Sequence, residues 1–415
     1  MLKKLILENW KSFRYAELPL DPLTVLIGTN ASGKSNVVEA LEFLRRIANG
    51  ENIQTALAGD KTLPSLRGGV ELAARKGENE FTIKALVSGE DDETDYLYSI
   101  TLITKPIMNN LNETITIINE KKNNYYPIKF GLTTEKLYLR SCLLNRSSIN
   151  VIRLDFIGIE SFGTKLNDKN SYQMKIVQEQ SLDIINKFIL PTIQNIHILN
   201  PIPLTMRNYS RLSENIESDG SNIAGVLAAL TDNKKTEVEN TLSEYIKDLP
   251  EGDIKKVWAE KVGRLGTDAM LYCQEEWKSG EIIEIDARSM SDGTLRFLAI
   301  LTALLTRPEG SQIVIEEIDN GLHPSRAALL VKILKEIGTK RNIDILLTTH
   351  NPALLDAFGS EIVPFVVVAH RDSETGESKL TLLEDIDNFP KLFASYSLGQ
   401  MTTKGAIERS LSHGE

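Results

Sequence analysis

Two glycines, a lysine and a serine stand at fixed offsets in residues 28–35, which read GTNASGKS. Glycines let the backbone curl around a phosphate group, so that successive N–H groups and the next helix N-terminus point at its negative charge. In such a loop Lys34 reaches the β- and γ-phosphates of a nucleotide, and the Ser35 hydroxyl holds Mg²⁺. A glycine-rich turn with a surface lysine is the alternative. The strand-like run before the segment and the amphipathic run after it favour a phosphate-binding loop.

Two carboxylates end an apolar run later in the chain. Residues 312–315 have the composition of a buried strand and are followed by Glu316 and Glu317. Ligands of open α/β sheets bind beyond the carboxyl ends of the strands. Carboxylates at that edge can hold Mg²⁺ through water and orient the water that attacks a γ-phosphate. Two charges marking an ordinary strand end are the alternative.

A histidine follows the next predicted strand, Ile343–Leu347, and Asn351–Pro352 then begins another helix. A lone histidine more often makes an ordinary core or surface contact than binds a ligand. Because His350 ends a strand of the same sheet series, we predict that it senses the γ-phosphate.

Hydroxyl groups and a glycine also precede a long apolar helix. Residues 289–296 read SMSDGTLR, and the apolar run Phe297–Leu305 follows them. Ser291 is predicted to lie near the N-cap, where free N–H groups beside hydroxyls bind anions. Ser291 and Gly293 are therefore a candidate anion site. A capped core helix without a ligand would have the same sequence.

Short strands and an amphipathic helix are predicted to position the phosphate loop. Leu23–Ile27 is a strand-length apolar run that ends at the loop, and Leu2–Leu7 is another. Beyond the loop, apolar residues recur at helical spacing from Val37 to Ile47, and Asn49–Gly50 supplies a stop. Further strands are predicted at Phe81–Val87, Tyr96–Thr104, Thr114–Ile118 and Tyr125–Phe130, with a hairpin tip at Lys121–Asn124.

Helical patterns take over between residues 165 and 262. The predicted helices are Ser171–Leu190, Ser221–Leu230 and Thr236–Ile246, the last two begun by Ser or Thr near an N-cap. We therefore expect a nucleotide-binding lobe with a β subdomain at 1–164, an inserted helical lobe at 165–262, a second nucleotide-binding lobe at 263–383, and a helical C-terminal tail at 384–415.

Composition restricts the class of protein. The 415 residues, with 41% hydrophobic and 25% charged side chains, indicate a compact globular chain with more than one lobe. Two cysteines, Cys142 and Cys273, are too few for a disulfide framework or zinc site and are predicted to be buried thiols. No signal peptide or membrane-length apolar stretch is found, so a cytoplasmic protein with no membrane partner is expected. The net charge of −10 disfavours a surface that binds nucleic acid throughout.

The phosphate loop, the segment 289–296, the carboxylate pair Glu316–Glu317 and His350 follow one another along the chain. This order resembles that of the ABC-type P-loop ATPases of the RecF, SMC and OLD group. It is most similar to the stand-alone AAA-family predicted ATPases associated with phage-defence systems. Residues 5–13 resemble that group's first strand, 28–36 its Walker A loop, 291–294 its signature motif, 316–317 its Walker B, 319–324 its D-loop region, and His350 its switch histidine. The resemblance implies an α/β fold: an ABC-type ATPase head with an antiparallel β subdomain and an inserted, mainly helical lobe.

The resemblance also implies a site for ATP and Mg²⁺. Nucleotide contacts are expected from Gly28, Asn30, Gly33, Lys34, Ser35, Asn36, Ser291 and Gly293, metal contacts from Ser35 and Glu316, and catalytic roles for Lys34, Glu317 and His350. In this group two subunits face head to tail, so Ser291 and Gly293 of one copy would contact the γ-phosphate bound by Lys34 of the other. ATP would close the dimer, and hydrolysis would reopen it.

Some positions depart from the group's pattern. Walker B is usually Asp then Glu, whereas here Glu316 precedes Glu317, so the extra methylene is expected to shift the Mg²⁺ ligands and slow hydrolysis. Gln54 is a candidate for the glutamine loop, although a solvated side chain explains it as well. Lys11 and Phe13 could border the adenine or simply form a strand edge.

Three classes of function are open. The first is a homodimeric or larger ATPase that senses or regulates a separately encoded effector, a nuclease or toxin, in antiphage defence. Only about 65 residues follow His350, so a nuclease is expected in trans. The second is a RecF- or SMC-like ATPase that binds DNA in repair or chromosome maintenance, with a basic groove built from Lys61, Arg67, Arg75 and Lys76. The third, a transporter subunit, is disfavoured because the resemblance is to non-transport ATPases.

Overall fold

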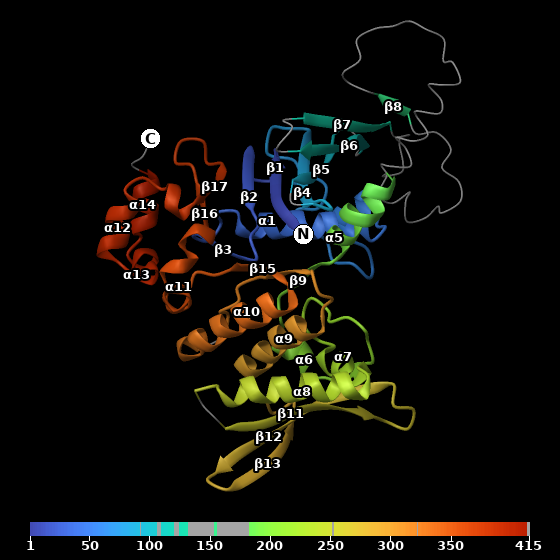
Figure 1. Ribbon diagram of the computed structural model, residues 1–415, viewed down its shortest axis with the longest axis vertical. Coiled ribbons are helices and arrows are strands. Elements are labelled where there is room, and N and C mark those ends of the chain that lie inside the picture. The colour runs from blue at the N-terminus through green and yellow to red at the C-terminus, as the bar shows by residue number, and fades with distance from the viewer. Residues whose placement is uncertain are drawn as a thin grey trace, which may run out of the picture. The chain divides into compact units, whose positions relative to one another are not determined.

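The computed structural model describes residues 1–91, 93–105, 109–119, 124–131, 153–155, 182–250, 253–321 and 323–412 (Figure 1). The chain divides into two compact units. Unit 1 comprises residues 1–20, 29–196 and 369–380, and unit 2 comprises 21–28, 197–368 and 381–415. The chain therefore passes from unit 2 to unit 1 inside the predicted phosphate loop, directly after Gly28.

Unit 1 contains an antiparallel sheet with the strand order β2-β1-β4-β5-β6-β7-β8. Its strands are β1 Leu2–Glu8, β2 Tyr15–Pro19, β4 Glu80–Ser88, β5 Thr94–Ile103, β6 Asn109–Asn119, β7 Asn124–Gly131 and β8 Arg153–Asp155. The strands predicted from the β-like pattern are confirmed, because one face of β4 and β5 is buried at alternate positions. Apart from Asn124, the predicted hairpin tip lies outside the described residues, as does Cys142.

An aromatic cluster joins this sheet to helix α1, Lys34–Ala48, which follows the phosphate loop. Trp10, Phe43 and Phe81 are fully buried, and the ring centroids of Trp10 and Phe81 are 4.9 Å apart. Trp10 Nε1 donates a 2.7 Å hydrogen bond to the carbonyl of Asn36 in the first turn of α1. The helix ends at Asn49, as predicted, and Gly50 follows in a left-handed conformation. A short helix, α2, spans Ile53–Ala58 and carries the exposed Gln54.

A second sheet has the strand order β17-β16-β3-β15-β14-β9. Its strands are β3 Leu23–Ile27, β9 Ile196–Leu199, β14 Gln312–Ile315, β15 Asp344–Thr348, β16 Val366–Arg371 and β17 Ser378–Leu382. The pairs β14–β15, β15–β3 and β3–β16 are parallel. Every residue of β14 and β15 is buried, which explains why these strands have no alternating pattern.

The core of unit 2 is completed by helices and a small antiparallel sheet. The helices are α6 Pro203–Met206, α7 Ile223–Ala229, α8 Asp232–Lys247, α9 Asp292–Thr306 and α10 Ala327–Arg341, and the sheet strands are β10 Ser210–Arg211, β11 Ile254–Val262, β12 Asp268–Lys278 and β13 Glu281–Asp286. Helix α8 lies along β11 (Figure 1), and α9 is buried over most of its circumference. Cys273 is buried in this core, as predicted.

Two helix starts differ from the prediction. Helix α7 is preceded by Asn222 rather than Ser221, and α8 begins four residues before Thr236. Asn222 takes this place because its side-chain amide bonds to the preceding loop, accepting from the N–H of Glu217 at 2.8 Å and donating to the carbonyl of Asn215 at 2.9 Å. The Thr236 hydroxyl donates to the carbonyl of Asp232, the usual bond of a threonine inside a helix.

The predicted helix Ser171–Leu190 is described from residue 182 onward. There the chain is helical and passes through a π-helical turn, Ile185–Ile189, into α5, Leu190–Gln194. In unit 1 α5 packs against α1, and Gln194 Nε2 donates to the carbonyl of Ala48 at 2.8 Å.

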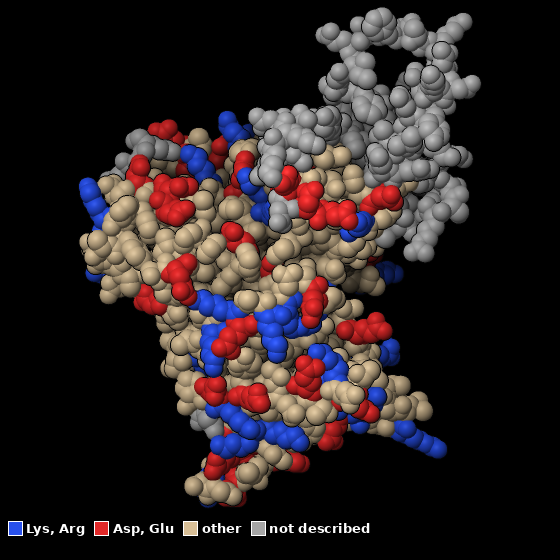
Figure 2. Space-filling view, in the orientation of Figure 1, with Lys and Arg blue, Asp and Glu red and all other residues tan. Residues whose placement is uncertain are grey.

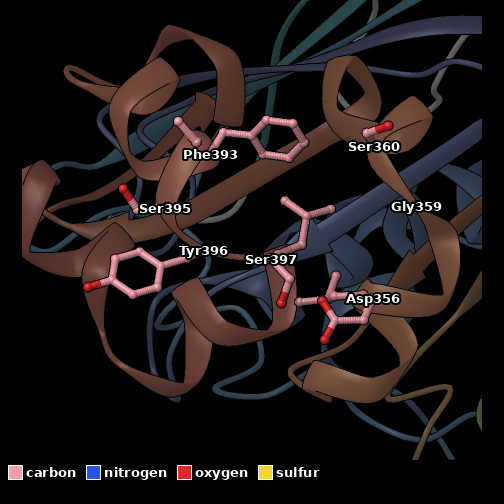
Figure 3. A pocket seen from close by; sticks show the side chains of 10 residues that line it. Asp356, Gly359, Ser360, Phe393, Ser395, Tyr396 and Ser397 are labelled. Atoms are coloured by element: carbon pink, nitrogen blue, oxygen red, sulfur yellow. The ribbon is translucent and has the colours of Figure 1, made fainter.

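The C-terminal segment is helical and packs on α11, Pro352–Phe358. Its helices are α12 Phe389–Ser395, α13 Leu398–Thr403 and α14 Ala406–Ser412. The N–H of Gly399 donates to Asp356 Oδ1 at 2.7 Å, and a Cβ at Gly399 would lie 2.3 Å from the carbonyl oxygen of Pro352. A cavity of about 400 Å³ remains between α11 and the loop from α12 to α13, with Phe393 and Asp356 on its wall (Figure 3). None of the helices described is both long and apolar enough for a membrane span.

Candidate nucleotide site

The predicted phosphate loop has a backbone that most residues avoid. Gly28, Ala31 and Gly33 have φ values of 144°, 63° and 115°. Within the part of the loop that belongs to unit 1, Lys34 Nζ donates to the carbonyl of Thr29 at 3.1 Å, so the lysine lies back across the loop. This is the backbone curl that the spacing of the glycines predicted.

Close packing beneath the loop fixes Gly33. A Cβ at this position would lie 2.8 Å from Phe13 Cζ and 2.9 Å from Ser378 Oγ. Phe13 is fully buried and therefore supports the loop rather than bordering an open adenine site. Asn36 Nδ2 donates to Ser12 Oγ at 2.7 Å, which ties the first turn of α1 to the same support.

Three polar side chains of the loop, those of Asn30, Ser32 and Ser35, differ in their exposure to solvent. Asn30 is exposed, Ser35 is half-buried, and the buried Ser32 hydroxyl has no hydrogen-bond partner among the described residues. An unpaired buried hydroxyl beside curled backbone N–H groups suits a phosphate oxygen as its missing partner.

A basic cavity of about 760 Å³ lies beside the loop in unit 1. Asn36 and Ser12 line it, as does Arg371, whose Nε donates to the carbonyl of Ala31 in the loop at 3.1 Å. Six basic and three acidic side chains line the cavity: Lys11, Arg67, Arg75, Lys76, Lys105 and Arg371, with Glu71, Glu78 and Glu377. The excess of positive charge favours an anionic ligand in a chain whose overall charge is −10.

Several of these basic side chains already have partners. Lys11 forms an ion pair with Glu39, and burial lowers the pKa of its ammonium group although Glu39 opposes this. Arg75 pairs with Glu78 at 2.8 Å and with Glu377 at 2.7 Å. Three of the four residues proposed for a DNA groove, Arg67, Arg75 and Lys76, line this cavity, and Arg67 and Lys76 are also exposed.

The strand ends of unit 2 converge at one sheet edge. Because β3, β14 and β15 are parallel, Gly28, the pair Glu316–Glu317 and His350 all follow carboxyl ends at the same edge. The hydrogen bond from the N–H of Thr349 to the carbonyl of Leu26 joins two of these ends at 3.3 Å. His350 is exposed there. The structure therefore brings the predicted Walker B carboxylates and the predicted switch histidine to the edge where the phosphate loop begins.

Glu317 has an unusual backbone conformation. Its φ is 45°, in the left-handed region that side chains other than Gly, Asn and Asp rarely adopt. The N–H of Glu317 donates to Thr348 Oγ1 at 2.8 Å, and the N–H of Ile318 to the carbonyl of Thr348 at 3.2 Å. Strained backbone of this kind persists where surrounding contacts enforce it and is concentrated at functional sites.

The turn after Glu317 is attached to the same strand end. Thr349 Oγ1 donates to Asp319 Oδ1 at 2.5 Å, and Thr349 is fully buried. The N–H of Glu316 donates to the carbonyl of Leu199 in β9 at 3.1 Å. Neighbouring strands on both sides therefore hold the backbone of Glu316 and Glu317 in place.

The predicted anion segment forms the start of α9. Ser291 is the N-cap residue, and its Oγ accepts from the N–H of Thr294 at 3.1 Å, as predicted. Gly293 lies in the first turn, and a Cβ there would be 2.8 Å from Arg326 Nη1.

Arg296, one turn further along α9, connects this helix to the Walker B turn. A Cβ at Gly321 would lie 3.4 Å from Arg296 Nε. Burial lowers the pKa of the Arg296 guanidinium, while the Asp292 and Glu317 carboxylates act in the opposite direction. A positive charge from α9 thus lies within electrostatic range of Glu317.

Sequence patterns did not identify four supporting residues: Arg207, Arg326, Thr348 and Arg371. From the sequence, Thr348 was placed at the polar end of a strand, without a role in the site. The arginines contact residues far away in the sequence, such as Asp292 for Arg207, and no local spacing encodes such contacts.

A match to a protein-family model identifies the family of this chain. A family model described as "AAA domain, putative AbiEii toxin, Type IV TA system" matches residues 23–356. The chain belongs to this family. The match includes the phosphate loop, α9, the Walker B carboxylates and His350, so the resemblance to ABC-type P-loop ATPases is confirmed.

One solved structure, with a TM-score of 0.50, agrees with this assignment at the level of the fold, and two further matches have lower scores. An SMC head bound to the C-winged helix domain of ScpA has 13% sequence identity and a TM-score of 0.50, over 92% of this chain and 96% of that one. An SMC head domain from Thermotoga maritima has 14% identity and a TM-score of 0.42, over 92% and 98%. An Smc head domain with an extended coiled coil, bound to the C-terminal domain of ScpA derived from Pyrococcus furiosus, has 12% sequence identity and a TM-score of 0.45. This match covers 95% of this chain and 99% of that one. No curated protein shows significant sequence similarity.

The fold class is therefore the expected α/β P-loop ATPase head, and membership of the AAA-domain family implies a nucleotide-binding ATPase. The residues predicted to hold Mg²⁺, Ser35 and Glu316, offer a hydroxyl and a carboxylate, the hard oxygen donors that this ion prefers. In the part of the chain that the structure describes, no cluster of three or more His, Cys, Asp or Glu side chains is arranged to hold a metal ion alone.

Proposed function

We propose that this AAA-domain protein binds and hydrolyses ATP with Mg²⁺, and that ATP closes a dimer whose opening follows hydrolysis. The observation that supports this best is the conformation of Glu317, held with a φ of 45° at the sheet edge where the phosphate loop begins. A carboxylate fixed there at an energetic cost suits the orientation of an attacking water.

The residues take distinct roles in this proposal. Lys34 and the loop from Gly28 to Asn36 bind the phosphates, and Asn30 faces solvent, where a second copy could approach it. Ser35 and Glu316 hold Mg²⁺, which neutralises phosphate charge when it is bound. Glu317 orients water, and His350 contacts the γ-phosphate. The basic cavity beside the loop receives the remainder of the nucleotide.

Dimerisation would complete the site with the N-terminus of α9. Ser291 and Gly293 of one copy would bind the γ-phosphate held by Lys34 of the other, where the helix dipole favours negative charge. On the face shown in Figure 2, basic and acidic side chains lie interspersed among other residues.

We further propose that the dimer regulates a separately encoded effector in antiphage defence. The family description names a putative toxin of a toxin–antitoxin system, which supports a partner protein. The SMC head in the first structural comparison is bound to a partner domain, which shows that such heads can dock other proteins. A RecF- or SMC-like role on DNA in the cytoplasm is the alternative outcome of the same experiment.

The test is purification of tagged protein with ATP and Mg²⁺, followed by measurement of intact mass and identification of co-eluting molecules. Lys34→Ala should weaken ATP binding at least about tenfold, because the charge opposing the phosphates is lost. Glu317→Gln should retain ATP and accumulate the dimer. A stoichiometric nuclease or toxin would support the regulator role, and retained DNA would support the alternative. Undiminished ATP affinity in Lys34→Ala would contradict the phosphate-loop assignment.

A further inference from the structure

Arg207 binds the chain directly before and within the first turn of α9. It follows α6, and its side chain is 25% exposed. Nη1 lies within hydrogen-bond distance of the carbonyl oxygens of Ala287, Arg288 and Met290, at 3.1, 3.1 and 2.6 Å. Nη2 lies 2.5 Å from Asp292 Oδ1. One guanidinium thus contacts four acceptors in a stretch of six residues.

This pattern shows that the turn is folded around a cation. Three carbonyl oxygens that converge on one nitrogen would repel one another if that nitrogen were absent. The turn also has backbone bonds of its own. The N–H of Ser289 donates to the carbonyl of Asp286 at 3.0 Å and that of Arg288 to Asp286 Oδ1 at 3.0 Å, whereas the bond from the N–H of Met290 to the carbonyl of Ala287 is long, at 3.4 Å. Arg207 adds contacts to three carbonyls and one carboxylate, and so helps to hold the chain between β13 and α9 in one conformation.

The contact between Arg207 and Asp292 changes the net charge at the start of α9. Asp292 is the first residue of α9, and its side chain is 67% exposed. A free carboxylate there would repel an anion approaching the N–H groups of the same turn, because both occupy the positive end of the helix. The ion pair with Arg207 neutralises this carboxylate and draws it to one side.

We propose that Arg207 is the positioning residue of the α9 anion site. It fixes the turn that presents Ser291 and it holds Asp292 away, so that the γ-phosphate of a nucleotide bound by a second copy can approach. This deepens the proposed function and rests on it for the identity of the anion. The effect of Arg207 on the turn itself does not depend on any ligand.

The first test measures amide hydrogen exchange of residues 286–294 in the nucleotide-free protein. Arg207→Met should raise exchange in this segment at least tenfold. Arg207→Lys should raise it as well, because a single ammonium nitrogen cannot reach both the carbonyls and Asp292. Arg211→Met is the matched control, since Arg211 is an exposed arginine four residues further on. Wild-type exchange in Arg207→Met would overturn the proposal.

The second test separates the effect of charge from that of folding. Arg207→Met should bind ATP with wild-type affinity yet lose ATP-dependent dimerisation and at least tenfold in kcat. Adding Asp292→Asn to Arg207→Met should restore part of the dimerisation, because the unneutralised carboxylate is removed. A loss of ATP affinity equal to the loss of kcat, or no restoration by Asp292→Asn, would contradict a role in presenting the anion site.

The two proposals can fail separately. A wild-type protein that neither binds ATP nor dimerises would refute the proposed function, whereas the hydrogen-exchange result would still decide whether Arg207 orders the turn. Far-UV circular dichroism and thermal unfolding of each variant identify a general folding defect. If Arg207→Met unfolds, Arg207→Lys gives the deciding exchange measurement.

Discussion

Gly293, in the segment assigned to anion binding, is in contact with Arg326, which follows the predicted D-loop region 319–324 by two residues. A Cβ at residue 293 would lie 2.8 Å from Arg326 Nη1 and 3.0 Å from the carbonyl oxygen of Gly321. Arg326 is 7% exposed, so it has little room to move away. The glycine is therefore required for packing within one chain, in addition to any contact it makes with a phosphate.

Gly293→Ala should destabilise the protein by about 1–3 kcal/mol, the usual cost of inserting a methyl group into a packed interior. It should also weaken ATP-dependent dimerisation, because the start of α9 must shift. Thermal or urea unfolding and mass measurement with ATP check the two effects. Gly338→Ala is the matched control, since its nearest neighbour would be Ile345 Cδ1 at 3.2 Å. Equal stability of wild type and Gly293→Ala would show that the contact is not tight.

Thr348→Val should lower kcat by about tenfold or more while ATP affinity is retained. The substitution removes the oxygen that accepts from the N–H of Glu317, a part-buried hydrogen bond of the kind that contributes about 0.5–1.5 kcal/mol. Glu317 would then relax from its left-handed conformation. Thr348→Ser keeps the hydroxyl and should remain close to wild type. Steady-state hydrolysis and equilibrium binding separate the two steps, and a wild-type kcat in Thr348→Val would exclude this positioning role.

Gly33→Ala should abolish nucleotide binding and also reduce stability. Its φ of 115° is unfavourable for alanine, and the added methyl group would overlap Phe13 and Ser378. We expect a loss of about 1–3 kcal/mol in the free energy of unfolding. Phe13→Leu combined with Gly33→Ala should recover little, because it relieves the overlap with Phe13 but neither the overlap with Ser378 nor the backbone strain. Full recovery in the double variant would assign the whole effect to packing.

Asp344 should make stability depend on pH. Burial raises the pKa of its carboxyl from 3.8 to about 6, with a smaller contribution from Asp21. Because the folded-state pKa is above the unfolded one, this group favours the native state fully below pH 3.8 and loses that contribution as pH rises through about 6. The change amounts to about 3 kcal/mol at most.

Asp344→Asn removes this titration. The variant should be more stable than wild type at pH 7.5 and no more stable at pH 4, as measured by urea unfolding at both values. Asp21→Asn is the comparison, because the same change at the neighbouring carboxyl should have a smaller effect. A stability difference between wild type and Asp344→Asn that does not change with pH would contradict the raised pKa.

Local sequence was sufficient to predict the elements that carry the site. An apolar run shows that a strand is buried, so β3, β14 and β15 and the polar residues after them could be placed at a sheet edge before the fold was known. Ser291 was identifiable as an N-cap because a hydroxyl residue stood directly before a helical pattern.

The contacts that hold those elements in position could not be predicted. Apolar spacing reports that a residue is buried but not which distant residue it meets, so the 85-residue separation of Arg207 and Asp292 left no pattern. The positive φ of Glu317 was equally invisible, because its cause is a bond to Thr348 from another strand. The N-cap of α7 was misplaced by one residue, because Asn222 bonds to the loop before it rather than to the helix.

The attachment of α13 to α11 joins the C-terminal segment to His350. Gly399 contacts both Pro352, two residues after His350, and Asp356, one turn further along α11. Because the carbonyl of Pro352 leaves no space for a side chain at Gly399, α13 cannot slide along α11 without lifting away from it. The C-terminal helices therefore pack against α11, a helix of seven residues or about 10 Å, which begins two residues after the histidine at the sheet edge. Substitutions in α13 are therefore expected to act on the segment that carries His350 as well as on the C-terminal helices themselves.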